Sequence, residues 1–424
     1  MTRLFFLLLA LDLGAGLAVG DTWDTLLADR MESSIAFRDA KIKLEQAELK
    51  YVQLSEPFRP TLSTRTVEKN AFAIRNGEFT GGTVETGLSL SGLFGTDLSM
   101  TAPLVVSADG SVAAGNPSLA LSRKLFTETS ADRLSAEAAL LKARILLRDA
   151  EASIRIQLAT DLLNAVYFSR RLDADRRYLA VMERDGAAAA EASRRDAEKK
   201  ILEARKAFLS SSVALKAYDS AIIEAAESEY PGVLARTSAL ATAPIDVIAA
   251  PPSSAAIRAQ ELELAAAEKR KAFSALPYLP NPGMAAVISY DLEGAKVDWG
   301  LTLQLSFDLL AKGERELDAR LRKENAVLER LRLTAAIKTL SDGIRSIRDR
   351  LEILELDRTL KALDLEDAAA EAARGEALFD GGFINEETLE IGRIELSIAR
   401  LDAMKTDHDI LIQRLNLARY YDAE

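Results

Sequence analysis

Residues 297–308 read Val-Asp-Trp-Gly-Leu-Thr-Leu-Gln-Leu-Ser-Phe-Asp and alternate between apolar side chains and polar or small ones. Because successive side chains of a strand point to opposite faces, this segment predicts a strand with two chemically different faces. The apolar face would carry Val297, Trp299, Leu301, Leu303, Leu305 and Phe307. The opposite face would carry Asp298, Gly300, Thr302, Gln304, Ser306 and Asp308. The segment thus predicts β structure in a chain whose other segments are mostly helical.

Two interpretations fit this strand. About 11 residues is the length of a tilted strand that crosses a bilayer, and a Trp on the apolar face suits the membrane interface. In that case the residues expected to face lipid are Trp299, Leu301, Leu303 and Leu305. Those expected to face a water-filled lumen are Asp298, Thr302, Gln304 and Ser306. A half-buried sheet of a water-soluble protein gives the same alternation.

A second strand is expected just before it. The run 285–290 is joined to it by Asp291-Leu292-Glu293-Gly294, whose composition is typical of a turn, so the two segments predict a hairpin.

Helical periodicity dominates elsewhere. Seven apolar residues follow one another at alternating steps of three and four: Leu333, Ile337, Leu340, Ile344, Ile347, Leu351 and Leu354. This is the seam of a left-handed coiled coil. The seam then shifts to Leu356, Leu360 and Leu363, which predicts apolar contacts on two sides of the helix. Residues 312–380 contain no proline, and such a helix would be about 100 Å long. Residues 127–230 are also free of proline.

The two halves of the chain repeat one order of elements. Glu56-Pro57-Phe58-Arg59-Pro60 recurs 220 residues later as Leu276-Pro277-Tyr278-Leu279-Pro280, each after an Ala-rich helical segment and before strand-like sequence. The first strand region is 36 residues longer. It includes an additional alternating hairpin, 83–91 and 96–104, for which an extracellular extension and a small separate sheet are the two alternatives. Pro117 lies inside the second strand that the pattern of the two repeats predicts for this region.

Composition removes whole classes of function. The chain of 424 residues has a formal net charge of -11, which argues against nucleic acid as its partner. It contains no cysteine and a single histidine, His408, so thiolate sites and two-histidine metal motifs are impossible. We expect His408, between Asp407 and Asp409, to be an ordinary surface residue. We expect no enzymatic activity, cofactor or metal.

Four segments are expected along the chain. Residues 1–20 have the features of a secretory signal peptide: Arg3, the apolar run 4–11, and small residues at Ala18 and Gly20. Residues 21–230 form the first structural repeat, 231–252 a Pro/Ala-rich linker or equatorial segment, and 253–424 the second repeat.

This duplicated pattern resembles the TolC family of outer-membrane channel-tunnel proteins. The resemblance rests on the helix-then-proline segments 47–62 and 265–279, the alternating strand, and the turn Gly382-Phe383-Ile384-Asn385 before a heptad helix. It implies a mainly α chain with a small β part. Duplicated coiled-coil hairpins would form an α-barrel, and four strands per protomer would enter a twelve-stranded transmembrane β-barrel of a homotrimer. The partners implied are outer-membrane lipid, a periplasmic adaptor and an inner-membrane transporter, in an efflux or type I secretion system.

The resemblance also implies a periplasmic tip where the tunnel narrows. We expect one tip turn at Gly382 and Asn385, with Asn385 as helix N-cap, and the matching turn of the first repeat near Ser193. The positions that match the family's acidic ring are Thr388 and Ile391, which are not acids. Glu387 or Glu390 would line a cation-selective entrance instead, unless these acids only stabilise the helix N-terminus.

Two other classes remain open. A periplasmic adaptor would show one helical hairpin with soluble β domains rather than a full duplication. An exported coiled-coil protein of the envelope would not need the two-faced strand.

Overall fold

The computed structural model describes residues 22–55, 59–66, 74–75, 78–79, 82–93, 96–124, 128–188, 194–241, 254–272, 281–292, 294–306 and 313–421. The expected signal peptide, 1–20, lies outside them. The chain divides into two compact units. The first consists of Met1–Ala40, Leu146–Ser254 and Thr339–Glu424, and the second of Lys41–Ile145 and Ala255–Lys338.

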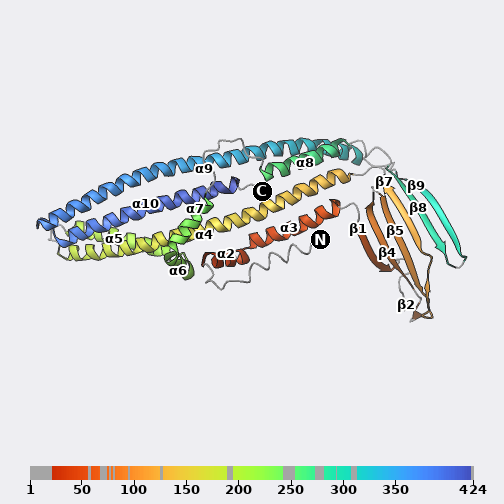
Figure 1. Ribbon diagram of the computed structural model, residues 1–424, viewed down its shortest axis with the longest axis horizontal. Helices are drawn as coiled ribbons and strands as arrows, with labels where there is room; N and C mark the ends of the chain where they lie inside the picture. The colour runs from red at the N-terminus through yellow and green to blue at the C-terminus, as the bar shows by residue number, and fades with distance from the viewer. Residues whose placement is uncertain are drawn as a thin grey trace. The chain divides into compact units, whose positions relative to one another are not determined.

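The chain is mainly α-helical with a smaller β part, as predicted (Figure 1). The helices are α2 (Thr22–Ser33), α3 (Ile35–Ser55), α4 (Thr129–Ala188), α5 (Arg194–Leu215), α6 (Ser220–Ser228), α7 (Tyr230–Leu240), α8 (Ala255–Ala272), α9 (Glu314–Asp380) and α10 (Glu386–Tyr421). The proline-free stretches form the two longest, α4 with 60 residues and α9 with 67. Among the described helices, none is both long and apolar enough to cross a membrane.

The strands are β1 (Arg59–Thr66), β2 (Ile74–Arg75), β3 (Glu78–Phe79), β4 (Gly82–Leu93), β5 (Thr96–Val106), β6 (Val112–Ala114), β7 (Ser118–Lys124), β8 (Asn281–Asp291) and β9 (Lys296–Ser306). All belong to the second unit. The expected hairpins are present as β4–β5 and β8–β9. Within the described parts of the chain, strands β2 and β3 form a separate two-stranded sheet.

The main sheet is antiparallel throughout, with the order β1-β4-β5-β7-β8-β9, and its strands lie side by side in Figure 1. The short strand β6 pairs with the end of β5, on residues that β7 leaves free. Strands β6 and β7 are therefore two pieces of one strand line. Pro117 lies at the break, where it has no N–H to donate, and its carbonyl accepts a hydrogen bond from Tyr290 N at 3.0 Å. Counted over the described residues, the main sheet is thus six strand lines wide.

This width differs from the four strands per protomer that the family resemblance implied. The β4–β5 hairpin, expected as an extension or a separate sheet, lies within the main sheet between β1 and β7. Eight residues of β1 pair with β4, so the hairpin separates β1 from β7 completely. The place of the hairpin depends on which strands pair with β4 and β5, and the alternation within one strand does not specify its neighbours.

The first unit has an apolar core built from segments distant in sequence. Helices α2, α4, α6, α7 and α10 contribute to one cluster, with Leu158, Leu162 and Leu163 of α4 fully buried. A second cluster joins α9 to α10: Ile344, Leu351 and Leu354 of the predicted seam pack against Ile410 and Leu417. The seam prediction is therefore confirmed over this stretch. Residues 231–240 of the expected linker belong to α7, and 242–252 lie outside the described residues.

A charged network also ties three helices of this unit together. Arg171 of α4 contacts Asp175 at 3.1 Å and Asp402 of α10 at 2.8 Å. Ser211 of α5 donates a hydrogen bond to Asp175 at 2.6 Å, and the Tyr167 hydroxyl donates to Asp402 at 3.0 Å. Burial, reinforced by the negative charge of Asp402, raises the pKa of Tyr167 to about 12. Since Asp175 is buried, removal of its Arg171 partner would leave an uncompensated charge.

The expectation for His408 was wrong. His408 is buried, with 1% of its surface exposed, and its Nε2 lies 2.8 Å from the hydroxyl oxygen of Tyr230 on α7. Each neighbouring carboxylate pairs with another residue: Asp407 forms an ion pair with Arg358, and Asp409 forms one with Lys405. Burial lowers the pKa of His408 to about 4, and the nearby charges of Lys405 and Arg170 act in the same direction. His408 is thus a neutral core residue at pH 7.

This burial makes the first unit sensitive to acid. The unfolded chain takes up a proton on His408 below pH 6.5, whereas the folded chain resists it until about pH 4. The free energy of unfolding should therefore fall by up to about 3 kcal/mol between these two pH values. Thermal unfolding at pH 7 and pH 4.5 should show a smaller drop in Tm for His408→Gln than for the native chain. Equal drops would contradict the assignment.

Candidate functional site

The sheet presents two faces of opposite chemistry, and the pairing registers carry each face across all six strand lines. One row of directly paired residues crosses the sheet: Leu62, Leu88, Met100, Leu119, Ile288 and Trp299. The neighbouring row on the same face is Pro60, Leu90, Leu98, Leu121, Ala286 and Leu301. The large members of the first row are exposed, up to 76% for Leu62 and 79% for Trp299. An exposed apolar surface of this extent is typical of a face that contacts another protein or a membrane.

The opposite face is polar or small in the same register. One row is Ser63, Gly87, Thr101, Ser118, Ser289 and Asp298. Hydroxyl pairs join neighbouring strands on this face, Thr61 with Ser89 and Thr101 with Ser118. Arg65 and Glu85 form a cross-strand ion pair at 3.2 Å. Such pairs stabilise a sheet while leaving the face hydrophilic.

The predicted residues of β9 divide between these faces as the alternation requires. Trp299, Leu301 and Leu303 lie on the apolar face and Asp298 and Thr302 on the polar one. The backbones of Gln304, Leu305 and Ser306 continue the strand by pairing with Gly283, Pro282 and Asn281, but their side chains lie outside the described part. Which face meets lipid and which meets water stays a prediction.

The turn between α9 and α10 forms the second candidate region. Gly382 has φ +71°, and Phe383 N donates to Leu378 O at 2.8 Å while Gly382 N donates to Phe379 O at 2.9 Å. This is a Schellman C-cap, for which glycine is the favoured residue. Asn385 Oδ1 then accepts Thr388 N at 2.9 Å, so Asn385 is the N-cap of α10 as predicted. Ser193, its expected counterpart, lies outside the described residues.

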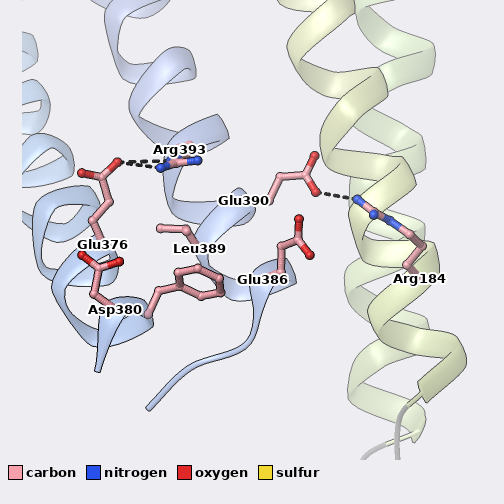
Figure 2. Close-up of a pocket in the computed structure, with 8 residues that line it drawn as sticks. Arg184, Glu376, Asp380, Glu386, Leu389, Glu390 and Arg393 are labelled. Atoms are coloured by element: carbon pink, nitrogen blue, oxygen red, sulfur yellow. Dashed lines mark hydrogen bonds and ion pairs between the residues drawn. The ribbon is translucent and has the colours of Figure 1, made fainter. Parts of the chain in front are cut away.

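A charged pocket of about 670 Å³ lies beside this turn. Figure 2 shows Glu376 and Asp380 of α9, Arg184 of α4, and Glu386, Glu390 and Arg393 of α10 around it. Arg393 pairs with Glu376 at 3.0 Å, and Arg184 pairs with Glu390. Four carboxylates and two guanidinium groups line the pocket, so it keeps a negative excess. Glu387 is half-buried, and it forms no ion pair within the described part of the chain.

Comparison with known proteins finds no matching family model and no matching curated protein. Solved structures do match over nearly the whole chain. The outer membrane protein VceC of Vibrio cholerae is 12% identical with a TM-score of 0.59, covering 94% of this chain and 95% of its own. The MtrE outer membrane channel of Neisseria gonorrhoeae is 14% identical with a TM-score of 0.57, covering 94% and 88%. The Campylobacter jejuni CmeC outer membrane channel is 12% identical with a TM-score of 0.56, covering 94% and 85%.

The chain has the fold of these outer-membrane channels. The resemblance to the TolC family, first seen in the duplicated sequence pattern, is therefore confirmed at the level of the fold.

Sequence reasoning missed part of this site. The sequence pattern does not assign the residues of β1, β4 and β5 to a face, although residues 83–91 and 96–104 alternate. Arg184 was missed as well, because the ion pair with Glu390 joins residues 206 positions apart.

The N-cap of α10 gives a local test of the tip. Asn385→Ala removes the acceptor of two hydrogen bonds from Thr388 and should lower the stability of the N-terminal end of α10 by about 1 kcal/mol. Hydrogen–deuterium exchange over residues 386–390 should accelerate several-fold. Asn385→Asp keeps a good N-cap and serves as the matched control. Equal exchange in all three proteins would contradict the capping role.

Proposed function

We propose that the chain forms the outer-membrane exit duct of an efflux or type I secretion system. Three copies would close a β-barrel in the outer membrane and a helical tunnel in the periplasm, engaging a periplasmic adaptor and an inner-membrane transporter. The duct would be passive, with no catalytic step. The fold shared with the outer-membrane channels VceC, MtrE and CmeC supports this assignment.

The two-faced sheet is the observation that carries the proposal. Its exposed apolar rows suit lipid, and its polar rows suit a water-filled lumen. An open sheet edge in lipid leaves backbone N–H and C=O groups without partners. The edge strands β1 and β9 would therefore have to pair with other copies, which makes the proposed channel an oligomer.

Cell fractionation separates this function from the two alternatives. A channel should stay with the outer membrane and be extracted by detergent as a trimer. An adaptor or a coiled-coil envelope protein should not depend on the apolar face of the sheet for its location. Release of the protein in aqueous buffer as a monomer would reject the channel.

Paired substitutions in β9 test the two faces. Leu301→Lys places a charge on the proposed lipid face, which should lower the stability of the barrel by about 2–4 kcal/mol near the bilayer midplane and block trimer assembly. Thr302→Lys, one residue away on the proposed lumen face, is the control and should be tolerated. Heat-modifiable mobility of the detergent-extracted trimer reports both. Equal tolerance at the two positions would sink the membrane assignment.

At the α9–α10 turn, we propose that Glu387 and Glu390 give the entrance a cation preference. Threefold symmetry would triplicate each charge around the axis. The positive charge of Arg184 partly offsets the negative charge of Glu390. Removal of either charge should therefore change the cation preference in opposite directions.

Single-channel recordings should resolve these contributions. Glu387→Gln and Glu390→Gln each remove a negative charge and should lower the cation preference. Arg184→Gln removes the offsetting positive charge and should raise it. A fall in all three variants would indicate a structural effect rather than an electrostatic one. No change in any of them would leave the acids with only a helix-stabilising role.

A further inference from the structure

We infer that each copy contributes six membrane-crossing strands, so that three copies enclose an eighteen-stranded barrel. This inference rests on the proposed function, because it concerns the barrel of that channel. It concerns the β4–β5 hairpin, which lengthens the first strand region relative to the second. Two strands before the long helix of each repeat would give four; the hairpin adds two.

The first argument is the place of the hairpin in the sheet. If it projected from the barrel, β1 and β7 would be neighbours. Instead β4 pairs with β1 on one edge and with β5 on the other, and β5 pairs with β7. Removal of the hairpin from the barrel wall would break both ladders, from Arg59–Ser91 to Thr66–Val84 and from Asp97–Ser122 to Thr101–Ser118.

The second argument is chemical. Leu88 of β4 and Met100 of β5 lie in the same cross-strand row as Ile288 and Trp299, and both are exposed. On the other face, Gly87 and Thr101 lie in one row with Ser289 and Asp298. A hairpin projecting into water has no reason to carry an exposed apolar row in register with the remaining strands.

The third argument is length. Strand β4 has 12 residues and β5 has 11, and β8 and β9 have 11 each. A tilted strand needs about 9–11 residues to cross the hydrocarbon layer. The two additional strands are therefore as able to cross as the pair from the second repeat.

Closure is consistent with this count. Neighbours along the path β1-β4-β5-β7-β8-β9 are antiparallel, so β1 and β9 run in opposite directions. The β9 edge of one copy would then meet the β1 edge of the next in the antiparallel sense, as in a fully antiparallel barrel. An odd number of strands per copy would force a parallel junction.

The strand number sets the width of the duct. Because barrel diameter grows roughly linearly with strand number, eighteen strands would give a barrel about 1.5-fold wider than twelve. Barrels of about 16–18 strands hold an open aqueous channel. The outer-membrane segment would accordingly admit larger hydrated cargo than a twelve-stranded barrel does.

Spin labels can separate six crossing strands from four. The chain has no native cysteine, so Leu88→Cys and Met100→Cys give single labelling sites in the full-length protein. Ile288→Cys and Leu301→Cys provide references on β8 and β9, and Ser99→Cys is a matched control on the polar face of β5. Labelled trimers in phospholipid vesicles are measured for collision with oxygen, which partitions into lipid, and with a water-soluble nickel chelate.

We expect oxygen to dominate at 88 and 100, as at 288 and 301, and the nickel chelate to dominate at 99. Nickel access at 88 and 100 with oxygen access at 288 and 301 would overturn the six-strand barrel and leave the channel intact. Nickel access at all four apolar positions would overturn the channel itself. Electron microscopy of the unlabelled trimer gives an independent count, eighteen wall strands against twelve.

Discussion

The unpaired edges of the main sheet limit the environments in which a single copy of this chain can be stable. Strands β1 and β9 each have one paired neighbour, and the apolar rows between them are exposed in a single copy. In water such a sheet invites uncontrolled edge pairing, and in lipid its unpaired backbone groups are costly. Closure with further copies satisfies both edges at once. This requirement supports the proposed channel independently of the shared fold.

Features that depend on residues close together in the chain could be predicted from the sequence. The faces of β9 were visible because apolar and polar residues alternate without a break from Val297 to Asp308. The turn at Gly382 and Asn385 was visible because a left-handed C-cap and an N-cap each favour a narrow set of residues. Helix α9 was visible because it combines an apolar seam with a long proline-free stretch. In each case a few neighbouring residues determine the structure.

Features that depend on contacts between residues far apart in the chain could not be predicted from the sequence. His408 stands between two aspartates, a context typical of a surface, yet α7 covers it through Tyr230, 178 residues away. The β4–β5 hairpin was recognised as a hairpin, but its place between β1 and β7 depends on register with both. Alternation fixes which side chains share a face of one strand. It does not specify which strand lies beside it.

The first unit also leaves apolar side chains exposed, for a reason independent of the sheet. Ile344, Leu351 and Leu354 of α9 are buried against α10, whereas Leu356, Leu360 and Leu363 remain largely exposed. These three are the residues at which the predicted seam shifts to a second side of the helix. A stripe of exposed leucines on a long helix needs a cover, and in a symmetric assembly the neighbouring copy can supply it. Each unit, taken by itself, therefore leaves apolar surface for another chain, and one homotrimer would satisfy both.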